Sequence, residues 1–322
     1  MTWADTKQLI ANIWPPKATF LPKDYKDLKG QVVLITGANS GVGYEAVKLL
    51  IPTGARIYIL SRSAERLEAA IAELKKQFPA ADLHYILVDF NDLTTVKGAA
   101  NSFLAKESRL DILIHNAGVM ALPTGTKTKQ GFEAHLGINV MGPTLLQELL
   151  TPILFKTASE INTTPNAVRV LFLNSTAHGQ SSPKGFDYDK LEDLTRPWML
   201  NYGDSKAETG IMILQWAKAH PAVSAKIPVL LVDPGYAKTG LQQHLSWFEA
   251  FFVNMLLNDP IISGYTVAYC ALSPDLTVKN TGDYIIPPGR IGRMRDDVKE
   301  SCTNEDGKKL RQWILERVLP YA

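Results

Sequence analysis

Only two cysteines, Cys270 and Cys302, occur in the 322 residues of this chain. They lack the spacing of a metal-ligand set and are too few for a disulfide framework, so we expect a reducing compartment and no metal. Long apolar runs are missing as well, because no stretch reaches the roughly 18 uninterrupted apolar residues of a membrane-spanning helix. The first residues show neither the basic region nor the apolar core of a secretory signal, so we expect a cytoplasmic location.

A strong charge of either sign is also lacking. Lysine and arginine number 34 against 32 aspartate and glutamate residues, which gives a formal net charge of +2 at pH 7. This balance gives no reason to expect nucleic acid or a strongly anionic surface as a partner. Hydrophobic residues make up 46% of the chain, which is enough for the large core of an ordinary globular protein.

What the chain does have is a regular alternation of short apolar, β-branched runs and longer helical patterns. Runs that are apolar on both faces are typical of strands covered by helices on each side. The expected strands are residues 31–36, 56–61, 84–89, 110–115, 168–174, 227–232 and 283–287. The expected helices are residues 42–52, 64–77, 93–106, 131–157, 203–219, 241–257, 261–272 and 305–318. The alternation predicts one Rossmann-type α/β domain over residues 30–322, a doubly wound, seven-stranded parallel sheet flanked by helices, after an N-terminal extension of residues 1–29.

The first strand runs directly into a glycine-rich turn over residues 36–43, which opens the first helix of the domain. Glycine permits a tight turn and lets the backbone approach a pyrophosphate without a Cβ in the way. The helix that follows offers N–H donors and the positive end of its dipole to the anion. Turns contain glycine for many reasons, but this context favours a dinucleotide site. The candidate contacts are Gly37, Asn39, Ser40, Gly41, Val42 and Gly43.

The end of the second strand carries a basic residue, Arg62, between Ser61 and Ser63. An NAD site usually places an acid here to bond the ribose 2′-hydroxyl, whereas an arginine suits a 2′-phosphate. The alternative is a solvated arginine at a helix start, with one of the two serines as the N-cap. We favour phosphate binding, and therefore NADP(H), with help from Asn39 and Ser40.

Polar or small residues also follow the third and fourth strands. Asp89 could accept a hydrogen bond from the adenine amino group, or it could cap the helix that begins near Leu93. Small residues after the fourth strand would let the backbone pass close to the cofactor ribose, although a simple strand-end turn would look the same. These residues are Asn116, Ala117 and Gly118.

A tyrosine and a lysine, Tyr202 and Lys206, lie one helical turn apart. A phenol has an ordinary pKa near ~10, too high for an efficient proton donor or base at neutral pH. A nearby ammonium favours the phenolate, so we expect Lys206 to lower the pKa of Tyr202 and to bond ribose hydroxyls. Taken alone, the pair would be interpreted as an exposed surface pair, since any exposed helix can carry one.

Two further polar residues point to the same chemistry. Ser175 closes the fifth strand and could donate a hydrogen bond to a substrate oxygen as charge develops there. Asn139 lies inside a long helical pattern, where asparagine has no propensity advantage. Its presence there indicates a polar function, such as holding a water molecule near Lys206. The alternatives are a helix-capping serine and a solvent-facing asparagine.

Together these residues resemble the short-chain dehydrogenases/reductases. The turn at residues 36–43, Asn116-Ala117-Gly118, Asn139, Ser175 and Tyr202-x-x-x-Lys206 match that family's pattern in order, and the resemblance covers roughly residues 28–290. Residues 233–239 are similar to the family's Pro-Gly segment, which contacts nicotinamide. The resemblance thus adds four candidate cofactor contacts, which are Pro234, Gly235, Ala237 and Thr239.

Within the family, the chain looks most like the retinol-dehydrogenase-like branch, because Ser175-Thr176-Ala177-His178 is similar to its Ser-x-Ala-His segment and residues 186–187 resemble part of its inserted loop. Two residues depart from the pattern. Asn174 replaces a serine that is common there, and Asp204 is an acid where small or hydrophobic residues are usual. The acid bears on the environment of Lys206.

The resemblance implies a pro-S hydride transfer between nicotinamide C4 and a carbonyl or alcohol carbon. In this scheme Tyr202 exchanges the proton with the substrate oxygen and Ser175 polarises it. Lys206 lowers the pKa of the tyrosine, and Asn139 completes the proton relay. With NADP(H), the family analogy favours reduction.

An unusually apolar segment, residues 245–257, lies where this family typically covers its substrate. It indicates a bulky lipophilic ketone or alcohol of terpenoid, steroid, retinoid or polyketide type. Core packing, a subunit interface in a homodimer, or weak contact with a membrane surface would explain the same composition.

Both ends of the chain read as amphipathic helices. Residues 3–14 have few basic residues, so we expect this helix to dock onto its own domain rather than anchor in a membrane. The C-terminal helix, capped near Thr303 or Asn304, is assigned to packing.

Two other functions are compatible with these motifs. One is a redox-neutral epimerase or isomerase that uses a bound nicotinamide, and the other is a nucleotide-sensing scaffold without turnover. Consumption of NADPH with a lipophilic ketone would exclude the scaffold, and product formation without net cofactor oxidation would favour the epimerase. The intact set of Ser175, Tyr202 and Lys206 favours an NADP(H)-dependent oxidoreductase, acting as a monomer or homodimer.

Overall fold

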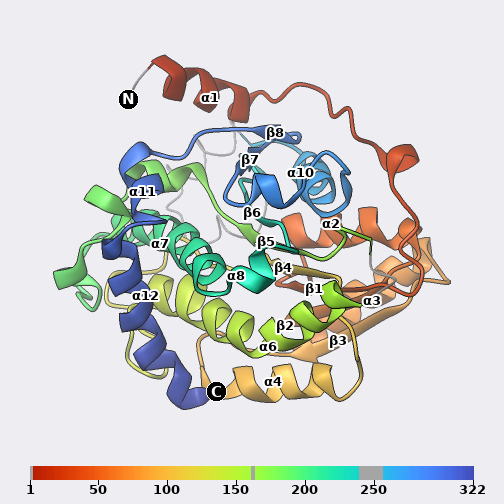
Figure 1. The fold of residues 1–322 in the computed structure, drawn as a ribbon, viewed down its shortest axis with the longest axis horizontal. Helices are drawn as coiled ribbons and strands as arrows, with labels where there is room; N and C mark the ends of the chain where they lie inside the picture. The colour runs from red at the N-terminus through yellow and green to blue at the C-terminus, as the bar shows by residue number, and fades with distance from the viewer. Residues whose placement is uncertain (1–2, 161–163, 239–256) are drawn as a thin grey trace.

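One mixed sheet runs through the centre of the molecule, with helices on both faces (Figure 1). The computed structural model describes residues 3–160, 164–238 and 257–322. The strand order in the sheet is β3-β2-β1-β4-β5-β6-β7-β8. The strands are β1 (Val32–Thr36), β2 (Arg56–Ser61), β3 (Leu83–Leu87), β4 (Ile112–His115), β5 (Arg169–Leu173), β6 (Val229–Val232), β7 (Tyr284–Ile286) and β8 (Arg290–Ile291). The order reverses between β1 and β4, which is the place where a doubly wound sheet binds its ligand.

The helices form two layers. Buried residues of α2, α3 and α10 join one core cluster, and those of α4, α6, α7 and α12 join the other. The bounds are α1 (Trp3–Ile13), α2 (Gly41–Leu50), α3 (Ala64–Gln77), α4 (Thr94–Leu104), α5 (Ala134–Leu136), α6 (Gly142–Ser159), α7 (Trp198–Ala219), α8 (Pro221–Ser224), α10 (Pro260–Leu272), α11 (Asp296–Ser301) and α12 (Glu305–Val318). Among the described helices, none is both long and apolar enough to cross a membrane.

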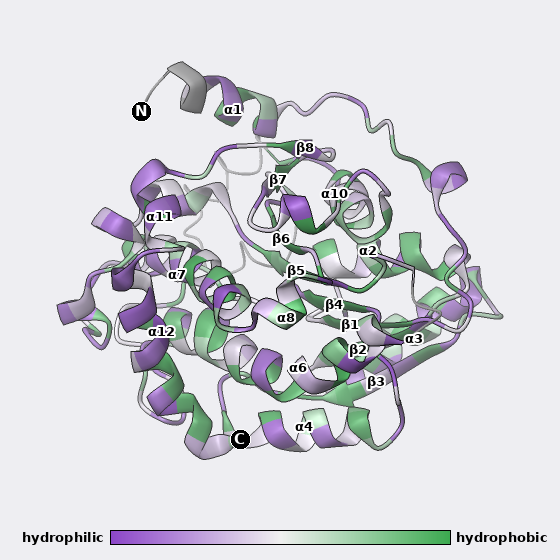
Figure 2. Cartoon of the chain, in the orientation of Figure 1, coloured by the Kyte–Doolittle hydropathy of each residue, from purple (hydrophilic) through white to green (hydrophobic). Residues whose placement is uncertain are grey.

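The strands are apolar throughout because their two faces pack against different helix layers. Along β1, Val32 and Leu34 belong to one core cluster, whereas Val33 and Ile35 belong to the other. Successive side chains of a strand point to opposite faces, so both sets must be hydrophobic in a sheet covered on both sides. In Figure 2 the green strands accordingly run through the interior.

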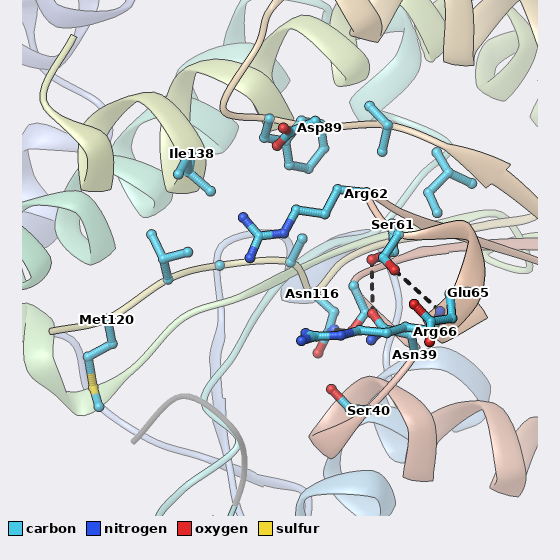
Figure 3. Close-up of a pocket in the computed structure, with 18 residues that line it drawn as sticks. Asn39, Ser40, Ser61, Arg62, Glu65, Arg66, Asp89, Asn116, Met120 and Ile138 are labelled. Atoms are coloured by element: carbon cyan, nitrogen blue, oxygen red, sulfur yellow. Dashed lines mark hydrogen bonds between the residues drawn. The ribbon is translucent and has the colours of Figure 1, made fainter. Parts of the chain in front are cut away.

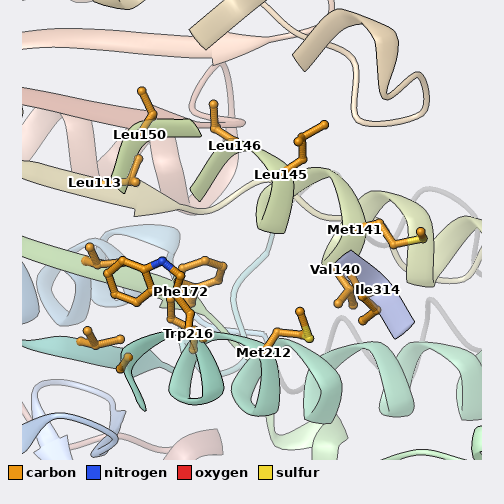
Figure 4. Packing of buried hydrophobic residues seen from close by; sticks show 14 of the residues in the cluster. Leu113, Val140, Met141, Leu145, Leu146, Leu150, Phe172, Met212, Trp216 and Ile314 are labelled. Carbon is orange, nitrogen blue, oxygen red and sulfur yellow. The ribbon is translucent and has the colours of Figure 1, made fainter. Parts of the chain in front are cut away.

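Leucines and aromatic residues fill the space between the sheet and helices α6 and α7 (Figure 4). Phe172 on β5 and Trp216 on α7 are nearly or fully buried there, and the indole Nε1 donates a hydrogen bond to Thr151 Oγ1 at 3.0 Å. The polar end of the tryptophan thereby keeps a partner inside the core. This packing fixes α7, which carries the candidate tyrosine and lysine, against the sheet.

The sequence-based prediction of the fold is confirmed, with one difference in the sheet. The sheet has an eighth strand, the two-residue β8, which is antiparallel to β7. Such a short strand carries no periodicity that a sequence pattern could reveal. The expected helix at 241–257, and with it the apolar segment at 245–257, lies outside the described residues apart from residue 257.

Helix α7 begins at Trp198, ahead of the predicted start at residue 203. Gly203 resembles a helix boundary in the sequence, but it lies inside the helix and serves a close contact. A Cβ at this position would lie 3.0 Å from the carbonyl oxygen of Ala177 and 3.2 Å from the amide nitrogen of Ser181. The glycine therefore lets the loop after β5 pack directly on the helix.

A buried arginine, Arg169 at the start of β5, holds the end of α10. It is 2% exposed, and its Nη1 donates to the carbonyl oxygen of Cys270 at 2.7 Å. Its Nη2 donates to the carbonyl oxygens of Ser273 at 2.6 Å and Leu276 at 3.1 Å. Helix ends leave carbonyl groups without partners in the helix, and a cation there also interacts favourably with the helix dipole. Although burial lowers the pKa of Arg169 to about 10, the guanidinium is charged at neutral pH.

Candidate active site

A cavity of about 490 Å³ opens at the carboxyl ends of β1, β2 and β4, next to the place where the strand order reverses (Figure 3). Many of the predicted cofactor contacts line it. These are Gly37, Asn39, Ser40, Arg62, Asp89, Asn116, Ala117 and Gly118. The lining also includes residues that the sequence analysis did not single out, among them Arg66, Met120 and Ile138.

The glycine-rich turn is a cradle that a side chain would fill. Gly37 has a positive φ of 68°, and a Cβ there would lie 2.7 Å from Ala117 Cα. At Gly43, in the first turn of α2, a Cβ would lie 2.5 Å from Asn116 Nδ2 and 2.8 Å from Ala38 Cα. Gly41 also has a positive φ, of 60°. The chain therefore passes close to its neighbours here and exposes backbone N–H groups at the start of a helix, which fits the pyrophosphate of a dinucleotide.

Two arginines extend into the part of the cavity beside β2. Both Arg62 and Arg66 are exposed, and Figure 3 shows their guanidinium groups directed into the cavity. Ser61 Oγ donates to Asn39 Oδ1 at 2.9 Å, so the turn after β1 is tied to the end of β2. Ser63 is the N-cap of α3, as the alternative interpretation expected, and it accepts a hydrogen bond from the amide of Arg66. The cap leaves both arginines available to an anion. Arg66 could have been found as a second arginine in the first turn of the helix that follows Arg62.

Residues after β3 and β4 line the cavity, and some of them also hold its walls in place by hydrogen bonds. Asp89 lines the cavity and accepts a hydrogen bond from the amide of Asn91 at 3.0 Å, whereas Asp92 accepts from the amide of Thr94 at the start of α4. Asn116 Nδ2 donates to the carbonyl oxygens of Thr36 at 2.8 Å and Gly37 at 3.0 Å. Asn116 thus braces the glycine turn against the end of β4.

Tyr202 and Lys206 lie in the second and third turns of α7 and are both largely buried, at 8% and 7% exposure. Lys206 Nζ is 5.8 Å from the centre of the Tyr202 ring and donates to the carbonyl oxygen of Leu173 at 3.2 Å. Gly118 packs closely on Asn139, because a Cβ there would lie 3.2 Å from Asn139 Oδ1, and the same position is 3.6 Å from Lys206 Nζ. Both side chains therefore lie inside the protein, and the alternative of an exposed surface pair is excluded.

The pKa of Tyr202 runs against the prediction. Burial raises it to about 12, and a hydrogen bond with Ser175 only partly offsets that rise. Burial also lowers the pKa of Lys206 to about 8, although the negative charge of Asp233 opposes this shift. The expected low pKa of the tyrosine is therefore not found in this structure, because loss of solvent raises the pKa more than the hydrogen bond with Ser175 lowers it. At neutral pH the phenol is protonated and can donate.

Ser175 is held in place by its neighbours on both sides. Its amide donates to Asn174 Oδ1 at 2.8 Å, and Asn174 Nδ2 donates to the carbonyl oxygen of Lys206 at 2.8 Å. The asparagine that departs from the family pattern therefore couples the serine to α7. The carbonyl oxygen of Ser175 lies 2.7 Å from His178 Nδ1, and the amide of Arg295 donates to His178 Nε2 at 3.3 Å. This second contact fixes Nδ1 as the protonated nitrogen of a neutral imidazole.

Asn139 lies in a π-helical turn, Gly137–Met141, between α5 and α6. Its Oδ1 accepts from the amide of Val119 at 2.7 Å, and its Nδ2 donates to Ser205 Oγ and to the carbonyl oxygen of Val119, both at 3.0 Å. The residue is buried, so the alternative of a solvent-facing asparagine is excluded. Its amide joins α7 to the segment after β4, and its part in a proton relay stays a prediction. A π-turn inside an α-helical run often marks a functional site.

Asp204, the second departure from the family pattern, is committed to partners other than Lys206. Its carboxylate accepts from Arg196 Nη2 at 2.6 Å and from the amide and hydroxyl of Ser182 at 2.6 and 2.9 Å. It therefore anchors the loop between β5 and α7. The acid that acts on the charge of Lys206 is Asp233, which lies directly after β6.

The predicted Pro-Gly contacts follow Asp233. Pro234 and Gly235 are partly exposed at the end of β6, and Ala237 pairs with Asn258 in a parallel bridge. Thr239 lies outside the described residues. The lining of the cofactor cavity includes neither this turn nor Tyr202 and Lys206. The turn nevertheless follows the carboxyl end of β6, and the pair lies on the adjoining α7.

Comparison with known proteins decides the family. Residues 31–187 match the family model described as short chain dehydrogenase. A short-chain dehydrogenase/reductase of Emericella nidulans, pkfC, is 36% identical over 92% of this chain and 95% of its own. The chain belongs to the short-chain dehydrogenase/reductase family. It is therefore an oxidoreductase of a family that uses nicotinamide cofactors, and the retinol-dehydrogenase-like branch stays a prediction.

Two more short-chain dehydrogenases/reductases match this chain over nearly its whole length, and solved structures have a similar fold. The relative iacJ of Pestalotiopsis fici is 36% identical over 95% of each chain, and one from Phomopsis amygdali is 33% identical over 98% of each. An uncharacterised protein of Mycobacterium paratuberculosis has the same fold, with a TM-score of 0.71 at 22% identity over 92% of this chain and 97% of its own. A short-chain dehydrogenase of Shigella flexneri complexed with NADP has a TM-score of 0.62 at 21% identity, over 80% of this chain and 98% of its own.

Proposed function

We propose that this short-chain dehydrogenase/reductase is an NADP(H)-dependent carbonyl reductase, or an alcohol dehydrogenase in the reverse direction. One observation carries the proposal. Tyr202 hydrogen-bonds with Ser175, and Asn174 links the amide of Ser175 to the backbone of Lys206, beside a cavity whose glycine turn fits a dinucleotide. An acid–base unit next to such a site is what transfer of a hydride and a proton requires.

The residues of the chain have distinct tasks in this reaction. Ser175 donates a hydrogen bond to the substrate oxygen, and Tyr202 gives that oxygen its proton. Lys206 supplies a positive charge beside the tyrosine and binds ribose hydroxyls. When bound, the nicotinamide supplies the hydride for reduction or accepts it for oxidation. The raised pKa of Tyr202 supports reduction, because a phenol that stays protonated at neutral pH is a donor.

NADP(H) is proposed as the cofactor because of the arginines beside β2. A 2′-phosphate carries negative charge and oxygen acceptors, to which a guanidinium can donate in parallel. Two proteins of similar fold have been solved with this cofactor, which supports the assignment. They are the Shigella flexneri protein in complex with NADP and an NADPH-bound oxidoreductase of Pseudomonas aeruginosa. The cradle at Gly37 and Gly43 supports the fit of the dinucleotide itself.

The cofactor assignment predicts a specific change in affinity. Arg62→Ala is expected to weaken NADPH binding about tenfold, since one charge-assisted hydrogen bond is worth roughly 1.5 kcal/mol. NADH binding should stay within about twofold, because NADH has no 2′-phosphate. Fluorescence titration with both cofactors measures this, and Arg293→Ala, which removes a half-exposed arginine outside the cavity lining, is the control. Equal affinity of the unmodified protein for NADH and NADPH would refute the role of Arg62.

A lipophilic ketone or aldehyde of terpenoid, steroid, retinoid or polyketide type is proposed as the substrate. The proposal rests on the composition of residues 245–257, of which all but the last lie outside the described structure. A panel of such carbonyl compounds, assayed with NADPH and NADH in parallel, tests the function. Loss of the reduced cofactor with a lipophilic carbonyl compound supports it. Turnover of small polar carbonyl compounds alone would contradict the substrate class.

A pH profile tests the role of Lys206. Because burial lowers the pKa of Lys206 to about 8, its charge is present below that pH and is lost as the pH rises through it. We therefore expect kcat/KM for carbonyl reduction to fall as the pH rises through about 8. Lys206→Met should be much less active and should lack this falling limb. An unchanged limb in the variant would show that another group titrates.

A further inference from the structure

The carboxylate of Asp233 is the junction between three parts of the active site. It is 1% exposed, and its Oδ1 accepts a hydrogen bond from the amide of Gly235 at 2.8 Å. It also accepts from the backbone of Thr176, the residue after Ser175, and its charge acts on Lys206. One acid thus accepts hydrogen bonds from the Pro-Gly turn and the serine turn, and its charge acts on the lysine.

Helix α1 reaches this acid from the far end of the chain. Asn12, which is fully buried in the last turn of α1, donates its Nδ2 to Asp233 Oδ2 at 3.1 Å. The hydroxyl of Tyr284 on β7 donates to the same oxygen at 2.8 Å. The backbone of Asn12 is close as well, because a Cβ on Gly235 would lie 3.4 Å from its carbonyl oxygen.

Helix α1 is bound to the domain at several points along its length. Gln8 bonds the backbone of Arg293 in both directions, at 2.9 and 2.6 Å. Near its C-terminus, Asn258 Nδ2 donates to the carbonyl oxygen of Ile13 at 2.8 Å, and Arg290 Nη2 donates to that of Ala11 at 3.3 Å. These donors satisfy carbonyl groups that the end of a helix leaves free. Figure 1 shows α1 lying beside β8, in agreement with the prediction that it docks onto its own domain.

The amide of Asn12 is poorly suited to a purely stabilising role. Its Oδ1 is buried and has no hydrogen-bond partner within the described residues. Burying an amide oxygen without a partner costs about 1–3 kcal/mol, so an apolar side chain would serve packing better at this position. Local rules are most often broken where function needs the residue.

We propose that α1 is a working part of the active site and that Asn12 is a positioning residue, which holds Asp233 and, through it, the Ser175–Thr176 and Pro234–Gly235 turns. The inference rests on the proposed function in one respect, which is that the Pro234–Gly235 turn meets the nicotinamide. Without the amide donor, the buried carboxylate has one hydrogen bond fewer, and its negative charge becomes less favourable. Asp233 is then held less firmly, so the two turns that donate to it are less well positioned and its effect on the charge of Lys206 is weaker.

The test compares two ligands that differ only at the nicotinamide end. Asn12→Leu keeps nearly the same volume and removes the donor, and Asn12→Ala is the second variant in case leucine does not fit. We expect the dissociation constant for NADPH to rise about five- to tenfold, whereas that for 2′-phospho-ADP-ribose, which lacks the nicotinamide, stays within about twofold. Thermal unfolding of the cofactor-free full chain should change little for Asn12→Leu. Ile10→Ala, on the exposed side of the same helix, should change none of these values.

Two results would overturn the inference. If the dissociation constants of both ligands rise by the same factor, Asn12 only supports the fold. If neither dissociation constant rises, the contact with Asp233 does not contribute to cofactor binding. With a carbonyl substrate in hand, Asn12→Leu should also lower kcat more than it changes KM for the carbonyl compound. Failure of the proposed reaction is a separate result: the unmodified protein would bind the cofactor and reduce no carbonyl compound, and the two-ligand comparison would still decide the role of Asn12. If NADH proves the tighter cofactor, ADP-ribose replaces the phosphorylated fragment.

Discussion

Replacing Tyr202 with phenylalanine is expected to lower kcat about a thousandfold while changing the affinity for NADPH by less than about twofold. The substitution removes one hydroxyl and keeps the ring, so the packing of α7 is preserved. What it removes is the phenolic hydroxyl that shares a hydrogen bond with Ser175. General acid catalysis by a positioned side chain is worth about 10²–10⁴-fold, and the upper part of this range applies where water is excluded. Steady-state kinetics and fluorescence titration measure the two quantities.

The matched control for Tyr202 is Tyr58→Phe. Tyr58 is also buried, at 3% exposure, and its hydroxyl donates to Glu107 at 2.8 Å, on β2 and away from the acid–base unit. This variant should lose some stability and keep its kcat. Full activity of Tyr202→Phe would remove the tyrosine from the reaction. Loss of NADPH binding in that variant would instead make it a cofactor-binding residue.

The largest expected effect on stability comes from Arg169. Arg169→Met should lower the free energy of unfolding by about 3–5 kcal/mol, because it leaves the carbonyl groups of Cys270, Ser273 and Leu276 buried without their donor. For a chain of this length that corresponds to a fall in Tm of roughly 4–7 °C. Differential scanning fluorimetry of the cofactor-free protein measures the shift.

An exposed arginine supplies the comparison for Arg169. Arg293 has a side chain that is 53% exposed and pairs with Asp296 on the surface, so Arg293→Met should change the free energy of unfolding by less than about 1 kcal/mol. A similar Tm for the two variants would mean that the carbonyl contacts of Arg169 add little. Arg169→Lys should fall between the unmodified protein and Arg169→Met, because a lysine keeps the charge but cannot reach three carbonyl groups in a plane.

Much of the candidate site could be predicted because its residues follow local patterns. The glycine turn, Arg62 and Asp89 all come directly after strands that are recognisable from their apolar runs. Since the carboxyl ends of parallel strands meet at one edge of the sheet, placing the strands also places these residues together. Tyr202 and Lys206 were recognisable from helical spacing, although the start of their helix was not.

The environment of the site could not be predicted in the same way. Spacing brought Lys206 close to Tyr202, but the pKa of a phenol depends on burial and on every charge around it. Asp204 lies between these two residues in the sequence, yet its carboxylate bonds Arg196 and Ser182. The acid that acts on Lys206 is Asp233, which follows the next strand along the chain. Distance in the sequence therefore says little about which charges act on the site.

Buried polar residues that hold distant segments together were missed for a related reason. Arg169 sits at the start of a strand and Asn12 in a short helix, and neither belongs to a motif. Their partners are 101 and 221 residues away, so only folding brings donor and acceptor together. A buried polar residue at such a position is recognisable once its burial is known, because it must find a hydrogen-bond partner.

The sequence by itself determined the order of strands and helices, the dinucleotide turn and the candidates for the reacting side chains. These depend on hydrophobic periodicity and on residues that follow one another closely, both of which can be read along the chain. The tertiary structure alone decided that Tyr202 is protonated, that the charge of Asp233 acts on Lys206 and that α1 docks against Asp233. Burial and through-space contact set those properties, and both arise only when distant segments pack together.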